Sequence, residues 1–261
     1  MRPPLRPDAI DRPARSRLGA DDPHAAEILA RHRDAVAAGR DTYTDPRTGL
    51  SVMTAASLVE RGWCCEAGCR HCPYTATTDK AAWRTWAGAT LAGVDLVAAS
   101  ARIVALLAPV LPAVPGRILV YRALPTEIDV WPLVEALGPR RFALTRTPER
   151  GPLTVHGAEG PLERHRLGFE QPVDTASRLG MDAVGAVLVP GLAFDRRGVR
   201  LGRGAGHYDR LLSGTAPTTL LLGVAAEALV VPELPVEPHD VAMTHLVTER
   251  GLIALGGPGS R

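Results

Sequence analysis

The sequence contains few aromatic side chains and no long apolar run. Aromatic residues make up 4% of the chain and hydrophobic residues 46%, so the core must consist mainly of leucine, valine and alanine. No apolar stretch reaches the ~18 residues that a membrane-spanning helix needs. The N-terminus begins Met-Arg-Pro-Pro and lacks the apolar segment of a secretory signal. We therefore expect a cytoplasmic protein without a membrane partner.

A strong excess of charge is also absent. The formal net charge is +2 at pH 7, which is too small to indicate a nucleic-acid partner. All four cysteines fall between Cys64 and Cys72, whereas a disulfide scaffold would distribute them along the chain. We expect a reducing compartment, no nucleic-acid partner, and a monomer or weak dimer.

Lysine is almost absent. The chain has 30 lysine and arginine residues, and Lys80 is the only lysine among them. A compact ammonium and a planar guanidinium are not equivalent, so a site that requires a point charge is where a lysine would persist. The alternative is chance retention at a solvated helix start. Arg84 follows four residues later, and on a helix the two side chains would share one face.

The order of apolar and polar segments predicts three parts: a tail and helix over 1–39, a small cysteine-rich module over 40–76, and an α/β domain over 77–256. Alternating buried strands and helices predict a three-layer, Rossmann-like, mostly parallel sheet with helices on both faces. Ligands of such sheets bind at the carboxyl ends of the strands. The expected helices cover 25–38, a segment with Lys80 and Arg84, 95–107 and 129–136; the expected strands cover 117–121, 142–145, 183–189, 219–224, 245–248 and 252–255.

A glycine-rich loop between a strand and a helix is the most informative segment of the chain. Glycines lack a Cβ and adopt positive φ, so such a loop can wrap closely around a phosphate. The free N–H groups of a helix starting near His207 would point at the same anion. The sequence is not a Walker motif, because no Gly-Lys-Ser/Thr closes it. An ordinary tight turn is the alternative. The candidate phosphate-binding residues are Arg200, Leu201, Gly202, Arg203, Gly204, Ala205, Gly206, His207 and Tyr208.

The segment from Pro190 to Asp209 resembles the signature of the 5-formyltetrahydrofolate cyclo-ligase family. It reads Pro-Gly-x-x-Phe-Asp, then Gly-x-Arg-Leu-Gly-x-Gly-x-Gly-His-Tyr-Asp, with His207 where the family has tyrosine. Lys80-Ala-Ala-Trp-Arg84 is similar to the Lys-x-x-Leu-Arg motif of the same family. The resemblance implies ATP-driven conversion of 5-formyltetrahydrofolate to 5,10-methenyltetrahydrofolate through an N5-iminium phosphate, with release of ADP and phosphate. It assigns the ATP phosphates to Lys80, Arg84, Arg200 and Arg203.

The resemblance also implies a folate side and a metal site. Tyr121–Asp129 resembles a family segment in which a glutamate contacts the folate, and that glutamate corresponds to Glu127. The resemblance implies His207 and Tyr208 as further substrate contacts. Pro235–Asp240 is similar to a family segment in which Asp240 would hold Mg²⁺ together with Asp209. Thr244, where many relatives have a second aspartate, is a departure from the family pattern.

The cysteine-rich segment carries a dense set of soft metal ligands. Cys64, Cys65, Cys69, His71 and Cys72 have the residue types of a zinc site or an iron–sulfur cluster. Buried, reduced thiols in a small core are the alternative. The segment resembles an uncharacterised cysteine-rich domain. Two further functions stay open: a non-catalytic regulatory protein that binds folate or nucleotide, with a metal-binding interaction module, and a different ATP-dependent transferase.

Overall fold

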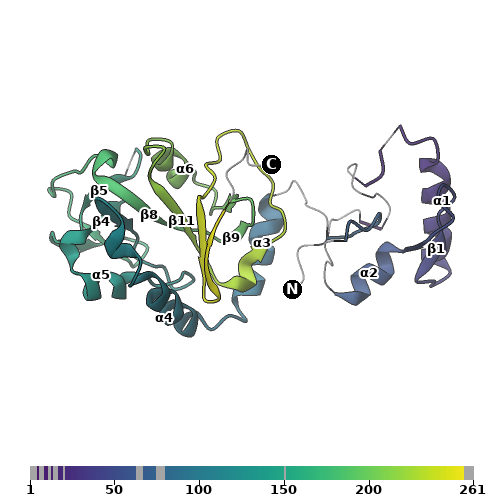
Figure 1. The fold of residues 1–261 in the computed structure, drawn as a ribbon, viewed down its shortest axis with the longest axis horizontal. Coiled ribbons are helices and arrows are strands. Elements are labelled where there is room, and N and C mark those ends of the chain that lie inside the picture. The colour runs from purple at the N-terminus through teal and green to yellow at the C-terminus, as the bar shows by residue number, and fades with distance from the viewer. Residues whose placement is uncertain are drawn as a thin grey trace. The chain divides into compact units, whose positions relative to one another are not determined.

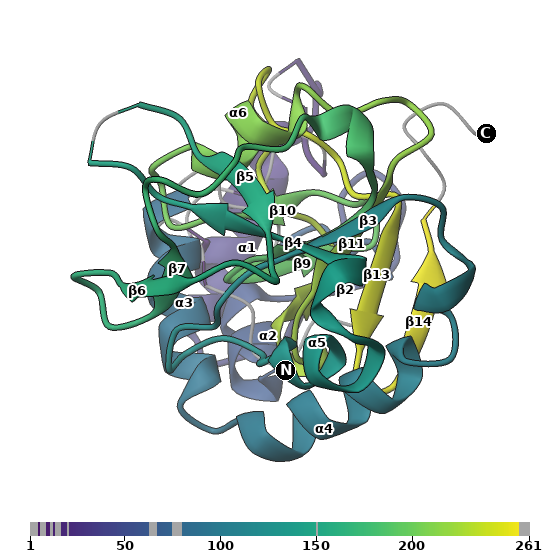
Figure 2. The same ribbon diagram turned by 90° about the vertical axis from the view of Figure 1, so that its left-hand side faces the viewer.

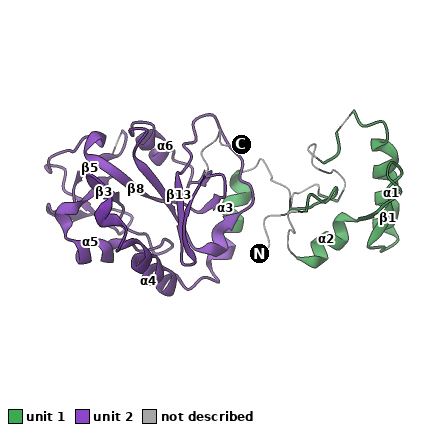
Figure 3. Ribbon diagram, in the orientation of Figure 1, with its two compact units in different colours: residues 1–86 green, residues 87–261 purple. Residues whose placement is uncertain are grey.

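The computed structural model divides the chain into two compact units, residues 1–86 and 87–261 (Figure 3). It describes residues 5, 9–10, 13, 17–19, 21–62, 67–74, 80–149 and 151–255. The expected boundary at residue 77 lies outside these ranges and stays a prediction.

The first unit is small and mixed. Its core gathers Leu18, Ile28, Ala35 and Tyr43. The helix expected over 25–38 is present, with His24 as its N-cap residue; the Asp22 carboxylate accepts from the backbone N–H of His24. The elements of this unit are α1 (Ala25–Ala37), β1 (Thr42–Thr44), its antiparallel partner β2 (Ser51–Met53), α2 (Ala55–Arg61) and the first part of α3 (Lys80–Leu91).

The second unit is built on a seven-stranded sheet of order β14-β13-β11-β8-β3-β4-β5. The neighbours from β13 to β4 are parallel, and β14 and β5 add antiparallel edges. This confirms the mostly parallel sheet. Figures 1 and 2 show α4 and α5 on one face and α6 on the other. The strands are β3 (Arg117–Val120), β4 (Phe142–Arg146), β5 (Thr154–Gly157), β8 (Val184–Pro190), β11 (Leu220–Val224), β13 (His245–Thr248) and β14 (Gly251–Ala254).

Helices and short 3-10 turns connect these strands. The helix expected over 95–107 is confirmed, with the Asp95 carboxylate accepting from the backbone N–H of Ala98 at 3.0 Å. The helix expected over 129–136 begins two residues later than predicted. The α-helices are α4 (Leu96–Leu107), α5 (Trp131–Leu137) and α6 (His207–Leu212), and the 3-10 turns are η1 (Leu111–Ala113), η2 (Pro139–Arg141), η3 (Met181–Ala183) and η4 (Glu227–Leu229).

The central strand β8 positions the glycine-rich loop. Ala186, Val187, Leu188 and Val189 are fully buried, as expected for a parallel strand covered on both faces. The chain leaves the carboxyl end of β8 at Pro190 and runs directly into the segment with the family signature. The loop therefore lies at the edge of the sheet where ligands of such folds bind.

Two small sheets of the second unit are not predicted by its sequence. One has the order β10-β9-β12, and the other is the hairpin β6–β7. Strands of two or three residues are too short to show an apolar period. Their bounds are β9 (Ala193–Asp195), β10 (Arg200–Leu201), β12 (Val230–Val231), β6 (Leu162–Arg164) and β7 (Glu170–Pro172).

The turn between β9 and β10 is held by a buried aspartate. The carboxylate of Asp195 accepts from the backbone N–H groups of Arg197, Val199 and Leu234. Gly198 has φ of +89°, and a Cβ there would lie 2.5 Å from the carbonyl oxygen of Met243. Only glycine fits this turn, which brings Arg200 back alongside Phe194.

Within the described residues, no single helix is long and apolar enough to cross a membrane, although α3 and α4 would meet that test of length and composition as one bent pair.

We predict that Glu159 contributes to the acid stability of the sheet. Hydrogen bonds from Arg117 lower the pKa of Glu159 from 4.5 to about 2. A lowered folded-state pKa gives stability that is complete above pH 4.5 and is lost as pH falls toward 2. Because the Glu159 side chain is 37% exposed, we expect it to contribute less than about 1 kcal/mol to the free energy of unfolding. Urea unfolding of wild type and Glu159→Gln between these pH values measures the difference between their free energies of unfolding. A difference that does not change with pH would contradict the prediction.

Candidate active site

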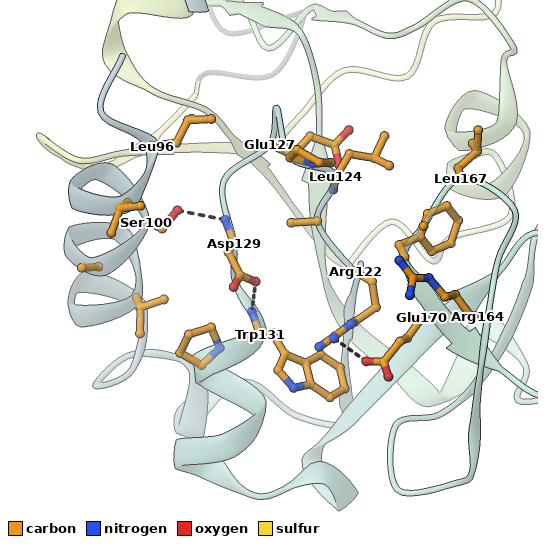
Figure 4. A pocket seen from close by; sticks show the side chains of 18 residues that line it. Leu96, Ser100, Arg122, Leu124, Glu127, Asp129, Trp131, Arg164, Leu167 and Glu170 are labelled. Carbon is orange, nitrogen blue, oxygen red and sulfur yellow. Dashed lines mark hydrogen bonds and ion pairs between the residues drawn. The ribbon is translucent and has the colours of Figure 1, made fainter. Parts of the chain in front are cut away.

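A cleft of about 1180 Å³ opens between α4, the segment that follows β3, and the β6–β7 hairpin (Figure 4). Leu96 and Ser100 line it from the helix, and Leu167 and Phe169 from the hairpin. The segment after β3 lines it with Arg122, Leu124, Glu127 and Asp129. Apolar walls with a few convergent polar groups are typical of a small-molecule site.

Arg122 and Glu170 line this cleft, and the sequence alone did not point to either of them. The guanidinium of Arg122 lies 4.1 Å from the ring centroid of Trp131 and forms an ion pair with Glu170 (Figure 4). Arg122 directly follows Tyr121 at the carboxyl end of β3. Because ligands of α/β sheets bind at this end of the strands, its position could have marked it as a candidate site residue. Its ion-pair partner Glu170 lies 48 residues along the chain, too far for a local pattern to connect.

Glu127 lies on the wall of the cleft, as a folate contact requires. One carboxylate oxygen, Oε2, accepts from the backbone N–H of Leu124 at 3.0 Å. The other, Oε1, accepts from Nε and Nη2 of Arg203, both at 3.2 Å. The structure thus brings together two residues that the sequence analysis assigned to different ligands, although they are 76 residues apart in the chain.

The glycine-rich loop has the conformation that its sequence predicts. Gly204 has φ of +102°, and Gly206, the N-cap residue of α6, has φ of +64°. An L side chain rarely adopts these angles, so both glycines are required by the backbone. The helix begins at His207, whose Nδ1 lies 3.2 Å from a guanidinium nitrogen of Arg210.

Arg200, Tyr208 and Asp209 form a compact group beside the loop. The Arg200 guanidinium, whose side chain is 6% exposed, donates to Oδ1 of Asp209 at 2.8 Å. It also lies 5.5 Å from the ring centroid of Tyr208. This ion pair joins β10 to α6 and so closes the loop between them.

Two tyrosines near this group keep their protons. Desolvation raises the pKa of Tyr208, and the nearby Glu127 carboxylate adds to the effect, against the opposing contributions of Thr145 and Arg200. Desolvation likewise raises the pKa of Tyr121, which donates to the carbonyl of Ile128 at 2.8 Å. Both phenols therefore serve as neutral hydrogen-bonding groups rather than as bases.

Asp240 lies in a group of potential metal ligands with Glu237 and His239. Ligand atoms of Glu237, His239 and Asp240 lie within 4.8 Å of one another, and among the described residues this is the group of three that could hold a metal ion. Asp209 is not a member of it. Oδ2 of Asp240 accepts from the backbone N–H of Glu237. A joint magnesium site of Asp209 and Asp240 stays a prediction.

Lys80 and Arg84 share helix α3, as their spacing predicts. Lys80 is the first described residue of α3, and both lie in the first compact unit. Their contact with ATP phosphates stays a prediction.

The described part of the cysteine-rich module packs His71 into a buried polar network. The His71 ring stacks on His32 at 3.8 Å, and its Nε2 lies 2.7 Å from the Tyr43 hydroxyl. Burial, with the neighbouring His32, lowers the pKa of His71 to about 3, so the ring is neutral. Cys69 and Cys72 close one turn through a backbone hydrogen bond of 3.2 Å.

Cys64 and Cys65 lie outside the described residues. The three described members of the expected metal site, Cys69, His71 and Cys72, do not bring their ligand atoms together as a group of three. A zinc or iron–sulfur site in this module stays a prediction.

Comparison with known proteins shows the family to which the second unit is related. The profile of the 5-formyltetrahydrofolate cyclo-ligase family matches residues 139–249. The 5-formyltetrahydrofolate cyclo-ligase of Escherichia coli K12 is 31% identical over 139 residues, which cover 50% of this chain and 76% of the relative. The chain belongs to the 5-formyltetrahydrofolate cyclo-ligase family. It is therefore an enzyme of that family by descent. Residues 31–78 match a family of unknown function, DUF5522.

Other cyclo-ligases share shorter or more distant similarity. The enzyme of Mycolicibacterium smegmatis is 54% identical over 70 residues, which are 26% of this chain and 36% of the relative. The solved 5,10-methenyltetrahydrofolate synthetase of Aquifex aeolicus has a TM-score of 0.57 and 26% identity, covering 70% of this chain and 95% of that one. The synthetase of Mycoplasma pneumoniae, at TM-score 0.51 and 15% identity, covers 66% and 99% and shares the fold. The cyclo-ligase fold of the second unit is thereby established.

We predict that Asp209 stabilises the fold of this cyclo-ligase independently of any ligand. Asp209→Ala removes the counter-charge of a guanidinium that is almost fully buried, so the free energy of unfolding should fall by about 2–3 kcal/mol. Arg203→Ala breaks a pair whose arginine is 46% exposed and should cost less than about 1 kcal/mol. Urea unfolding without nucleotide measures both. Equal stabilities of Asp209→Ala and wild type would show that Arg200 does not depend on this carboxylate.

Proposed function

We propose that this chain catalyses the ATP- and Mg²⁺-dependent conversion of 5-formyltetrahydrofolate to 5,10-methenyltetrahydrofolate. The observation that carries the proposal is the contact of the glycine-rich loop with the wall of the large cleft, through Arg203 and Glu127. A reaction that transfers a phosphoryl group to a folate needs a phosphate loop and a folate cleft side by side. Membership in the cyclo-ligase family supports the same activity.

The cleft would hold the folate between apolar walls. Glu127 would accept hydrogen bonds from the amino and ring N–H donors of the reduced pterin, because an ionised carboxylate is purely an acceptor. Tyr208 and His207, at the start of α6, are the proposed further contacts. The neutral phenol of Tyr208 suits a hydrogen bond to an uncharged substrate atom.

The loop side would hold the triphosphate of ATP. Residues 202–206 would supply backbone N–H donors, while Arg200 and Arg203, with Lys80 and Arg84, would neutralise phosphate charge. The formyl oxygen attacks the γ-phosphorus and ADP leaves; N10 then attacks the iminium carbon and loses its proton to water, and phosphate departs with the electrons of the C–O bond. No covalent protein nucleophile is needed, so the protein acts through positioning, charge neutralisation and exclusion of water.

The carboxylates of Asp209 and Asp240 are the residues we propose to hold Mg²⁺. Carboxylate oxygens, completed by phosphate oxygens and water, match the preference of this hard ion. When bound, the ion neutralises charge on the phosphates. Asp209 already accepts from Arg200 through Oδ1, which orients its carboxylate next to the loop.

The decisive test follows the near-UV absorbance of the methenyl product. Purified protein mixed with Mg-ATP and 5-formyltetrahydrofolate should develop this band only when ATP is present. Lys80→Ala should lower kcat/KM by about 10²–10³-fold, because one preorganised charge on the reacting phosphates is lost. Arg33→Ala, on the exposed face of α1, is the matched control and should keep wild-type rates. Wild-type activity in Lys80→Ala would remove Lys80 from the site.

A folded sample that binds ATP but forms no product would instead support the regulatory protein. In that case, restoring tyrosine at His207 and aspartate at Thr244 would be the first changes to examine.

We also propose that the cysteine-rich module binds zinc or an iron–sulfur cluster through its thiolates. Its cysteines are soft ligands confined to nine residues. Elemental analysis and the visible absorbance of anaerobically purified protein should show one of these metals, and Cys69→Ser should remove it. Metal-free protein with intact folding would leave buried thiols as the role of these residues.

A further inference from the structure

We propose that Arg203 is a positioning residue that couples the ATP site to the folate site. Its guanidinium is hydrogen-bonded to the Glu127 carboxylate until a phosphate group binds the guanidinium in its place. This inference rests on the proposed function and adds to it an order of events that no single subsite explains.

The two oxygens of Glu127 already have donors. Arg203 donates to Oε1 through Nε and Nη2, and Leu124 donates to Oε2 through its backbone N–H. A carboxylate offers about four lone-pair sites. With three donors in place, Glu127 cannot accept two further hydrogen bonds from a pterin while Arg203 stays.

Arg203 is also the arginine that can leave. Its side chain is 46% exposed, and among the described residues its guanidinium bonds only to Thr126 and Glu127. It lies between Gly202 and Gly204, where the backbone has few steric restrictions. The guanidinium of Arg200, by contrast, is buried and tied to Asp209 within the same motif. One arginine is therefore fixed and the other is exchangeable.

A triphosphate would compete directly for the exchangeable arginine. It carries more negative charge than one carboxylate, and a guanidinium binds phosphate oxygens in the same bidentate manner as carboxylates. When the ATP phosphates bind the Arg203 guanidinium, the Oε1 atom of Glu127 can accept hydrogen bonds from the folate. Linkage is reciprocal, so nucleotide should tighten folate binding and folate should tighten nucleotide binding by the same factor.

Calorimetric titration of the full chain tests this coupling. We expect 5-formyltetrahydrofolate to bind about two- to fivefold more tightly when Mg²⁺ and a non-hydrolysable ATP analogue are present, the range expected from breaking a partly exposed ion pair. Arg203→Ala should bind the folate two- to fivefold more tightly than wild type without nucleotide. In that variant the analogue should no longer change folate affinity.

The nucleotide-free affinity is the discriminating readout. If Arg203 only contacts phosphate, or only stabilises the loop, Arg203→Ala leaves nucleotide-free folate affinity unchanged or weaker, and the coupling role is overturned. Arg196→Ala removes the same charge from an exposed arginine of the neighbouring hairpin and should leave folate affinity as in wild type. Wild-type protein that neither binds folate nor forms product overturns the proposed function itself, whereas wild-type turnover with an unaltered Arg203→Ala affinity overturns the coupling alone.

Discussion

The ion pair between Arg200 and Asp209 is the constraint on which the candidate site depends. It joins β10 to the first turn of α6 and therefore fixes both ends of the glycine-rich loop. The glycines of the loop do not hold it in one conformation by themselves, because glycine has the most conformational freedom to lose on folding. The buried guanidinium of Arg200, paired with the Asp209 carboxylate, holds the two ends of the loop together.

The order of strands explains why the segment after β3 and the glycine-rich loop can meet. β3 pairs with β8 in parallel, with Leu119 opposite Val187. The two strands consequently end at the same edge of the sheet, one leading to the cleft lining at Arg122 and the other to the signature segment after Pro190. Residues from distant parts of the chain, such as Glu127 and Arg203, reach hydrogen-bonding distance because of this pairing.

The main elements could be predicted from the sequence where a single physical signal dominates. The buried strand β8, the positive-φ glycines and the start of α6 at His207 all follow from local composition. The β9–β10 hairpin could not be predicted, because it depends on the buried Asp195 and on contact with Met243, which are tertiary features. The environment of Arg122 was missed for the same reason. Carboxylate pairing was least predictable, since any N–H or O–H donor or cation can satisfy an aspartate.

The placement of Trp131 gives the second unit an optical property. It is the only tryptophan among residues 87–261, and its ring lies on the cleft wall under the guanidinium of Arg122. The indole is therefore a native fluorophore located where the small molecule would bind, with a cation against its face. Replacing the tryptophans at positions 63, 83 and 86 by phenylalanine would leave an emission signal that reports on the cleft alone.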